Sequence, residues 1–234
     1  MRVKTILMAA AAVSSIGVAN IGTASAGEAF EVSGNVAFTT DYRFRGISLS
    51  DNNFAVQGGF DVGHSSGLYV GTWASNVERG DGQGSTELDL YGGYAGEAGA
   101  IGYDVGVILY AYPESDDLNY YELYGSISGT AGLVALTAGL AYVPEQDNTG
   151  DEDTTYIYAS AGLPLGESPY SLGAHIGYED GAFGDEKIDY SLSVDKACED
   201  WGIDLSLAWI ATENTEGVGD ASDDAVVFTV SKSM

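Results

Sequence analysis

Apolar and polar side chains alternate along most of this chain. From Phe30 to Phe44 the even-numbered positions are mainly apolar or aromatic, whereas the odd-numbered positions are mainly polar or small. A period of two places successive side chains on opposite faces of a β-strand. The pattern therefore predicts a strand with one face in an apolar environment and the other in water.

The same alternation returns eleven more times, which predicts twelve strands in all. The eighth segment, with Tyr156 and Tyr158, is the least clear, because Ile157 makes its other face nearly as apolar. The apolar positions that define the eleven further segments are Phe54, Val56, Phe60 and Val62; Tyr69, Gly71 and Trp73; Leu88, Leu90 and Tyr94; Ile101, Tyr103, Val105, Val107 and Leu109; Tyr121, Leu123 and Ile127; Val134, Leu136, Leu140 and Tyr142; Tyr156 and Tyr158; Tyr170, Leu172, Ile176 and Tyr178; Ile188, Tyr190, Leu192 and Val194; Ile203, Leu205, Leu207 and Trp209; and Val226, Phe228 and Val230.

The connections between these segments alternate between short and long. The short ones are residues 64–67, 96–100, 129–132, 163–169 and 196–201. The long ones are residues 46–53, 78–85, 113–119, 144–154, 180–187 and 212–224. The long set holds 19 of the 35 acidic residues, so more than half of the carboxylates are expected on one rim. Short periplasmic turns and longer extracellular loops are typical of outer-membrane barrels.

The length of the segments agrees with a membrane-spanning barrel. About ten residues at roughly 3.3 Å each, tilted by about 40°, rise about 25 Å, the height of the apolar band of such barrels. Lipid cannot satisfy an open sheet edge, so the first and last strands must pair. We therefore expect an all-β fold, a transmembrane antiparallel up-and-down barrel of about twelve strands with a backbone diameter of roughly 24 Å.

Aromatic residues gather near the ends of the predicted strands. These residues include Tyr42, Phe44, Tyr110, Tyr112, Tyr120, Tyr121, Tyr156, Tyr158 and Trp201. In outer-membrane barrels such residues form girdles at the two membrane interfaces. We expect two girdles here.

The N-terminus has the features of a secretory signal peptide. Arg2 and Lys4 precede an apolar run from Ile6 to about Val18, which the small residues Ala24 to Ala26 follow. The run is too short to span a membrane. We expect cleavage before Gly27, so that residues 1–26 are the signal peptide and residues 27–234 form an outer-membrane barrel. After Gly27 no stretch of 18 apolar residues occurs, which excludes helical membrane spans.

The charge balance excludes one class of partner. Without Arg2 and Lys4, six basic residues remain against 35 acidic ones, a formal charge of −29. A nucleic-acid partner is therefore not expected. Acidity of this kind also occurs in disordered chains, but aromatic residues make up 11% of this one. A single cysteine, Cys198, leaves the fold without an internal disulfide.

Two segments resemble the TorF family of porin-like proteins. They are Thr40-Asp41-Tyr42-Arg43-Phe44-Arg45-Gly46-Ile47-Ser48 and Gly67-Leu68-Tyr69-Val70-Gly71-Thr72-Trp73-Ala74-Ser75-Asn76. The resemblance extends from about Phe30 to Ser233 and implies a Gram-negative porin-like barrel without a demonstrated substrate. Leu49 departs from it where a polar residue is expected, and Met234 departs from the aromatic residue with which such barrels usually end. The assembly machinery reads that terminal signal, of which Phe228 keeps part.

If the apolar face of each segment contacts lipid, the opposite face lines the lumen. The candidate pore-lining residues on that face are Glu31, Asp41, Arg43, Arg45, Asp61, Glu87, Asp89, Asp104, Glu122, His175, Glu179, Asp189, Asp195 and Asp204. Carboxylates dominate this set, and a low-dielectric wall focuses their field. We expect passive diffusion of small solutes with a preference for cations. Arg43 and Arg45 either help to form a constriction or pair with Asp41 and neighbouring carboxylates to hold the barrel.

An enzyme is not expected. Some twelve-stranded barrels are lipid hydrolases that use serine and histidine on the outer surface, but His64 falls in a turn and His175 on the lumen face, without a nucleophile motif. No cofactor motif or His/Cys metal spacing occurs. The aspartate-rich loops at 147–153 and 220–224 lack the EF-hand spacing, so no metal site is expected.

The expected partners are outer-membrane lipid, lipopolysaccharide bridged through Mg²⁺ or Ca²⁺, small solutes, and the barrel-assembly machinery. Two alternatives stay open. A soluble β-sandwich or lipocalin-like barrel would hide its aromatic faces inside, although twelve such faces oversupply one core. A structural or adhesive outer-membrane barrel without a through-path would share the fold but not conduct ions.

Overall fold

The computed structural model describes residues 29–78 and 84–234, which form a closed antiparallel barrel. The expected signal peptide, residues 1–26, lies outside the described residues. Around the barrel, each strand pairs with its neighbours in the order β1-β14-β13-β12-β11-β10-β9-β8-β7-β6-β5-β4. The fold class and the twelve wall strands predicted from the alternation are confirmed. In the described part of the chain, none of the helices is long and apolar enough to cross a membrane.

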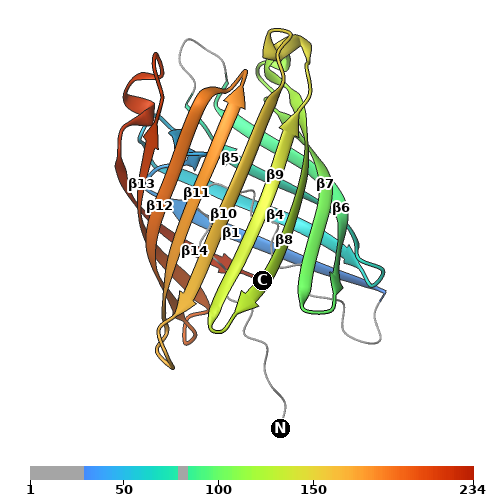
Figure 1. Cartoon of the computed structure of the whole chain (residues 1–234), viewed down its shortest axis with the longest axis vertical. Coiled ribbons are helices and arrows are strands. Elements are labelled where there is room, and N and C mark those ends of the chain that lie inside the picture. The colour runs from blue at the N-terminus through green and yellow to red at the C-terminus, as the bar shows by residue number, and fades with distance from the viewer. Residues whose placement is uncertain (1–28, 79–83) are drawn as a thin grey trace.

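Long tilted strands make up the wall (Figure 1). The twelve wall strands are β1 (Phe30–Thr39), β4 (Ala55–His64), β5 (Leu68–Asn76), β6 (Thr86–Ala98), β7 (Ile101–Ala111), β8 (Tyr120–Ala131), β9 (Val134–Val143), β10 (Thr154–Pro164), β11 (Tyr170–Gly181), β12 (Gly184–Cys198), β13 (Ile203–Glu213) and β14 (Ala225–Ser233). Two further strands are not part of the wall and pair with each other: β2 (Arg43–Phe44) and β3 (Ile47–Ser48).

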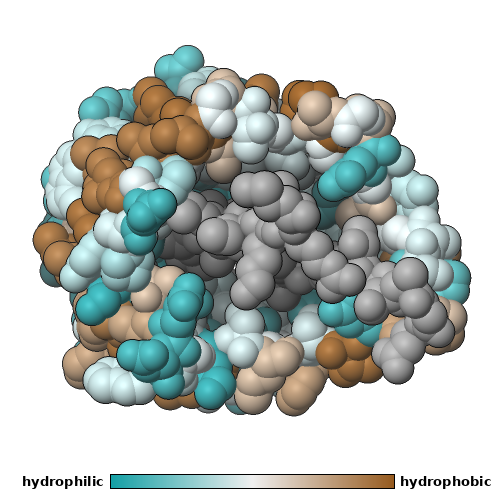
Figure 2. All heavy atoms as spheres, turned by 90° about the horizontal axis from the view of Figure 1, so that it is seen from below, coloured by the Kyte–Doolittle hydropathy of each residue, from teal (hydrophilic) through white to brown (hydrophobic). Residues whose placement is uncertain are grey.

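The two faces of the wall differ as the alternation predicts. On β1 and β4 the apolar side chains of Val32 and Phe60 are 71% and 65% exposed, whereas Asp61, next to Phe60, is 1% exposed. Figure 2, which looks at the molecule from below, shows apolar side chains at several places around the outer circumference. An ordinary water-soluble barrel does not turn its large apolar residues outward on every strand.

The barrel closes through a short seam between the first and last strands. β1 and β14 pair from Asn35 opposite Ser233 to Thr39 opposite Thr229. Backbone hydrogen bonds of 3.0 and 2.8 Å between Gly34 and Met234 extend the seam by one more pair. The ring of wall strands is therefore closed, as a membrane-spanning sheet requires.

The connections at the two ends of the barrel differ in length. At one end, which we call the short-turn end, the strands are joined by residues 65–67, 99–100, 132–133, 165–169 and 199–202. At the other, the long-loop end, the connections include three short 3₁₀ helices, which are η2 (Asp116–Leu118), η3 (Asp147–Thr149) and η4 (Gly219–Ser222). The loop expected at 180–187 is wrong in extent. β11 continues to Gly181 and β12 begins at Gly184, with a bulge between Glu179 and Gly181.

Two predicted strand faces are wrong. Tyr69, Gly71 and Trp73 were expected on the lipid face of β5, but Tyr69 is 4% exposed, while Val70 beside it is 60% exposed. On β10 the side chain of Tyr156 is 2% exposed and that of Ile157 is 52% exposed. Both strands therefore turn their tyrosines inward, because a tyrosine hydroxyl finds polar partners in the lumen that lipid does not offer.

The expected aromatic girdles are confirmed only in part. Tyr121 and Trp201 lie outside, at 41% and 74% exposure. By contrast, Tyr42, Tyr110 and Tyr112 are buried inside the barrel. Much of the aromatic content thus belongs to the interior.

The segment from Phe30 to Phe44 is not one strand. β1 ends at Thr39, after which residues 40–54 turn into the barrel as a loop that contains the β2–β3 pair. Its central residues Arg43, Arg45 and Gly46 are all buried. We call residues 40–54 the inward hairpin. The alternation of side chains continues into the inward hairpin because β2 is also extended. However, β2 pairs with β3 and not with a wall strand.

Candidate functional site

A tight turn forms the tip of the inward hairpin. Phe44 pairs with Ile47, and the two residues between them, Arg45 and Gly46, have φ angles of 49° and 84°. Two consecutive positive φ values at a two-residue connection match a type I′ turn, the turn whose twist suits a β-hairpin. Gly46 also lies against the wall, because a Cβ there would overlap Thr212 Oγ1 and lie 2.9 Å from Asp189 Cβ.

Arg45 carries the tip across the lumen. Its Nη1 donates to Glu179 Oε1 on β11 at 2.7 Å, and its Nη2 donates to Glu122 Oε2 on β8 at 2.6 Å. Its guanidinium carbon also lies 4.3 Å from the ring centroid of Tyr156 on β10. The hairpin begins between β1 and β4, and β8 to β11 lie on the other side of the twelve-strand ring. The hairpin therefore bridges the barrel from one wall to the opposite one.

The guanidinium of Arg45 stays charged in this environment. Burial alone would lower the pKa of Arg45, but the carboxylates of Glu122 and Glu179 outweigh it and raise the pKa. The ammonium of Lys187 on β12 pairs with the second oxygen of Glu179. Two cations thus share this carboxylate, and the pairs are all buried.

Asp41 and Arg43 hold the base of the hairpin. Asp41 Oδ2 accepts from Arg43 Nε at 2.6 Å, and Asp41 Oδ1 accepts from the Ser48 hydroxyl at 2.6 Å. Arg43 Nη1 donates to the carbonyl of Gly46 at 3.0 Å and to that of Asp223 at 2.7 Å. Arg43 therefore ties the hairpin to the loop between β13 and β14.

Tyr42 joins the hairpin to β6. Its hydroxyl donates to Glu87 Oε1 at 2.6 Å, and the hydroxyl of Tyr112 donates to Glu87 Oε2 at 2.5 Å. Burial and the neighbouring Glu87 carboxylate raise the pKa of Tyr42, so its hydroxyl remains a donor. The hairpin is thus attached to the wall at several separate points.

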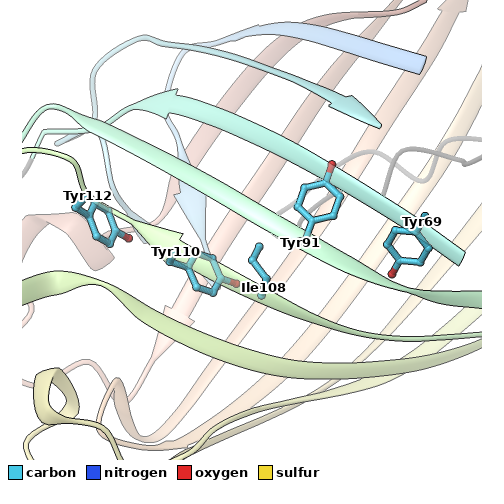
Figure 3. Packing of buried hydrophobic residues seen from close by; sticks show 5 residues of the cluster. All are labelled: Tyr69, Tyr91, Ile108, Tyr110 and Tyr112. Atoms are coloured by element: carbon cyan, nitrogen blue, oxygen red, sulfur yellow. The ribbon is translucent and has the colours of Figure 1, made fainter. Parts of the chain in front are cut away.

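Tyrosine–carboxylate pairs continue along the inner face beyond the hairpin. The hydroxyl of Tyr91 donates to Asp61 Oδ1 at 2.6 Å, and that of Tyr69 donates to Asp104 Oδ1 at 2.7 Å. Figure 3 shows Tyr69 and Tyr91 in line with Ile108, Tyr110 and Tyr112, with which they form one cluster. A hydroxyl donor of this kind stabilises a carboxylate inside the barrel without supplying a positive charge.

The structure places the sequence-predicted lumen residues on the inner face of the wall or on the inward hairpin. Those that are buried are Asp41, Arg43, Arg45, Asp61, Glu87, Asp89, Glu122, Glu179 and Asp189. Those that are partly buried are Glu31, Asp104, His175 and Asp195, and Asp204 is exposed. The hairpin brings Asp41, Glu87, Glu122 and Glu179 into one network, whereas Glu31 and Asp204 lie on strands near the short-turn end, away from it.

The sequence left two roles open for Arg43 and Arg45, a constriction of the pore or ion pairs that hold the barrel. The structure contains the ion pairs. A constriction also fits, because the ion pairs of Arg45 cross the lumen.

His175 takes part in a serine–histidine–aspartate series on the inner face. Its Nδ1 lies 2.8 Å from Ser160 Oγ, and its Nε2 lies 3.3 Å from Asp189 Oδ1, to which Tyr156 also donates at 3.2 Å. Ser160 lies in the middle of β10, which pairs with β9 and β11 on both sides, so its backbone amides belong to the sheet. Nothing in this arrangement offers an oxyanion hole. The series joins three neighbouring strands.

Sequence reasoning missed Lys187 and the inward tyrosines. Lys187 was assigned to a loop, yet it lies on β12 two residues before Asp189 and has the same orientation. Extending the alternation of β12 backward would have found it. Tyr69 and Tyr156 were missed because tyrosine was counted as apolar, whereas glycines on the facing strand positions gave the only signal that large rings needed room inside.

The charge of the interior is strongly negative. Eleven of the sequence-predicted lumen residues are carboxylates, and the basic residues on the inner side of the described chain are Arg43, Arg45 and Lys187. Within the described residues, Asp61, Asp89 and Asp104 form no ion pair with a basic side chain. In the described part of the chain, carboxyl groups therefore outnumber basic side chains in the lumen.

Comparison with known proteins places the chain in a family. Residues 23–234 match the model of a family described as "Bacterial protein of unknown function (Gcw_chp)". The chain belongs to this family. No curated protein matches this Gcw_chp protein in sequence. The resemblance noted at residues 40–48 falls on the inward hairpin, so the most distinctive motif of the sequence forms the most distinctive part of the barrel.

Solved structures of outer-membrane channels share the fold of the Gcw_chp protein. The KdgM porin superposes with a TM-score of 0.60 at 8% identity, over 86% of this chain and 97% of the porin. The NanC porin gives 0.52 at 8% identity, over 87% and 98%. The COG4313 outer membrane channel from Pseudomonas putida F1 gives 0.50 at 11% identity, over 86% and 94%. The fold is that of an outer-membrane porin-like barrel.

This fold gives the two ends of the barrel an orientation. In outer-membrane barrels the short turns face the periplasm and the long loops face the outside. The inward hairpin and the acidic loops therefore belong to the extracellular half of this Gcw_chp protein. A solute that enters from outside meets the hairpin first.

Proposed function

We propose that this protein is an outer-membrane channel for passive diffusion of small solutes, that it prefers cations, and that the inward hairpin is its constriction. The observation that carries the proposal is the bridge of Arg45 to Glu122 and Glu179, which sets a charged hairpin across a lumen rich in carboxylates. We also propose that the fourteen candidate residues named from the sequence line the pore, and that the family of this chain is the TorF family of porin-like proteins.

The charge distribution supports cation preference. Arg45 and Lys187 are occupied by buried carboxylates, so neither is offered to a passing anion. Asp61, Asp89 and Asp104 lie beside the path without a basic partner in the described part of the protein, and Asp61 Oδ2 and Asp89 Oδ1 are buried there without a hydrogen-bond partner. A low-dielectric wall focuses the field of such groups and enriches cations.

The expected cation preference can be compared with the ligand of a structurally similar porin. One KdgM structure is described as a complex with disordered oligogalacturonate, a polymer of acidic sugars. In the described lumen of the Gcw_chp protein, carboxylates outnumber basic residues, an arrangement that disfavours an acidic polymer. We therefore expect it to exclude polyanions of that kind, although the barrel is similar.

A second function has one observation in its favour. The hairpin is attached to the wall through Tyr42, Arg43 and Arg45, which are all buried, and a barrel filled in this way fits a structural or adhesive protein without a through-path. Acidic loops at the long-loop end would then contact surfaces or bind lipopolysaccharide through divalent cations.

Planar bilayers separate the two functions. Purified mature protein is added to one side of a bilayer in symmetric KCl, and the current is recorded at a fixed voltage. The channel proposal predicts discrete conductance steps, whereas the structural alternative predicts silence from protein that circular dichroism and heat-modifiable migration show to be folded. A salt gradient then gives the ion preference.

A further inference from the structure

His175 on β11 contacts two of the wall residues against which the tip of the inward hairpin packs. Its Nε2 lies 2.9 Å from the Tyr156 hydroxyl on β10 and 3.3 Å from Asp189 Oδ1 on β12. These three strands are neighbours in the wall (Figure 1). The guanidinium of Arg45 lies over the ring of Tyr156, and a Cβ on Gly46 would lie 2.9 Å from Asp189 Cβ. Only one wall residue on each side therefore separates His175 from the tip of the hairpin.

The surroundings of His175 provide hydrogen bonds for either charge state. A protonated histidine donates from both ring nitrogens and needs two acceptors. Ser160 Oγ lies 2.8 Å from Nδ1, and Asp189 Oδ1 lies on the side of Nε2. In the neutral ring the hydroxyl of Ser160 donates to Nδ1 instead, because a hydroxyl both donates and accepts. Neither form requires the neighbouring side chains to leave their places.

Asp189 has no ion pair with a lysine or an arginine in the described part of the chain. Its side chain is 2% exposed, and its Oδ2 is buried without a hydrogen-bond partner among the described residues. Lys187, two residues earlier on β12, pairs with Glu179 instead. A positive charge on His175 gives Asp189 an ionic partner that the neutral imidazole does not.

The titratable and charged groups around His175 come from several elements. Two tyrosines of β10 contact it, Tyr156 through its hydroxyl and Tyr158 through its ring, whose centroid lies 5.8 Å from that of the imidazole. Phenols are neutral at physiological pH. Asp104 on β7 interacts electrostatically with Tyr158. The charged groups nearer the tip of the hairpin are Asp189 and Lys187 on β12, Glu179 on β11, Glu122 on β8 and Arg45 on the hairpin itself.

One proton changes the charge balance at the tip. Among the described groups named there, two basic side chains face three carboxyl groups, a formal net charge of −1. A protonated His175 brings this formal charge to zero. Histidine changes charge between about pH 5 and 8. The tip therefore attracts cations less strongly as the pH falls through this range, because the potential of a charged passage follows its net charge.

We propose that His175 makes the ion preference of the channel depend on pH. As the pH falls, the imidazole takes up a proton, pairs with Asp189 and lowers the preference for cations at the hairpin. This inference rests on the proposed function and adds a regulation of the same constriction. It requires no movement of the hairpin, since the added charge acts directly on passing ions.

The chain has two histidines, which supply a matched control. His64 lies at the short-turn end of β4, where its ring contacts Ser66 and Phe30 and not the hairpin. Untagged His175→Gln and His64→Gln are compared with the wild type in planar bilayers. Reversal potentials in a KCl gradient are recorded from about pH 8 to about pH 5, the range in which histidine changes charge. Heat-modifiable migration checks that each variant is folded.

The difference between the variants carries the result, because lumen carboxylates also take up protons as the pH falls. Over this range the ratio of cation to anion permeability should fall roughly two- to five-fold further in the wild type and in His64→Gln than in His175→Gln. His175→Lys keeps a positive charge throughout. At about pH 8 its ratio should already lie roughly two- to five-fold below that of the wild type.

A second measurement needs no change in the lumen. The imidazole signals of His175 are followed by NMR in detergent, and the His64→Gln variant distinguishes them from those of His64. They should report a change of charge between about pH 8 and about pH 5.

The outcomes separate this inference from the proposed function. Currents whose pH dependence is the same in both glutamine variants overturn the inference and leave the channel intact. An imidazole of His175 that keeps one charge state over the whole range does the same. Folded protein that gives no current refutes the channel and the inference together.

Discussion

Arg45, at the tip of the inward hairpin, donates a 2.7 Å hydrogen bond to Glu179 on the opposite side of the barrel. The same guanidinium reaches Glu122 three strands away, so one residue joins the first connection of the chain to two distant wall strands. Removing one partner of a buried ion pair leaves the other charge buried and uncompensated. This relationship makes the position of the hairpin testable.

Arg45→Gln should release the hairpin. Glu122 and Glu179 lose their shared cation, which we expect to cost about 3–5 kcal/mol of stability. Single-channel conductance should rise because the hairpin no longer bridges the lumen. The control is Lys232→Gln, which removes one positive charge from an exposed position on β14. Equal conductance in the Arg45 variant and the wild type would show that the hairpin does not limit the current.

Asp61 and Asp104 should set part of the ion preference. They lie beyond the hairpin and form no ion pair in the described structure, so the double variant Asp61→Asn with Asp104→Asn removes charge while keeping acceptors for Tyr91 and Tyr69. Because potentials in charged clefts reach several kT, the ratio of cation to anion permeability should fall by a few-fold. Reversal potentials measure it. Asp200→Asn, in an exposed turn, should change nothing, and an equal effect there would refute the role of the lumen pair.

Gly46 should be needed for the close fit of the hairpin. Gly46→Ala meets both a positive φ of 84° and a wall formed by Thr212 and Asp189. Gly132→Ala is the matched control, because its φ is 66° and nothing lies within 4 Å. Both variants bear a backbone cost of about 1–2 kcal/mol, and only the first bears a clash. Limited proteolysis should therefore cleave the hairpin faster in the Gly46 variant, and equal rates would contradict the packing described.

Phe60 should contact lipid. Phe60→Arg places a charge on the outer face of β4, where the side chain is 65% exposed, and arginine on the lipid face of a barrel costs up to about 2–4 kcal/mol. Denaturant unfolding from liposomes measures the change. Gln57→Arg, on the inner face of the same strand, should cost much less because the new charge enters the polar interior and not lipid. Similar losses in both variants would contradict the assignment of faces.

The alternation of side chains was enough to predict the barrel because lipid and water sort every wall strand in the same way. It failed where an aromatic residue was counted as apolar. Tyr69 and Tyr156 donate to carboxylates inside the barrel. The polar hydroxyl therefore determines which face of the strand each tyrosine occupies, whereas the apolar ring fits either face. Gly93 and Gly177, on neighbouring strands, leave the room that these two rings occupy inside the barrel.

The inward hairpin could not be found by alternation. The alternation that begins at Phe30 continues to Phe44 because both residues lie in extended strands. A period of two shows that a segment is extended but does not show which strand it pairs with. Arg45 and Gly46 together form the turn, but arginine is not a typical residue at positive φ. The ion pairs that hold the hairpin join residues more than 70 positions apart, which no local pattern contains.

The reversal potential of the wild-type protein in a KCl gradient tests the central claim most directly. The account predicts a potential of the sign that marks K⁺ as the more permeant ion, reduced in magnitude by high salt because mobile ions screen the carboxylates. A potential of the opposite sign, which marks Cl⁻ as the more permeant ion, would contradict it.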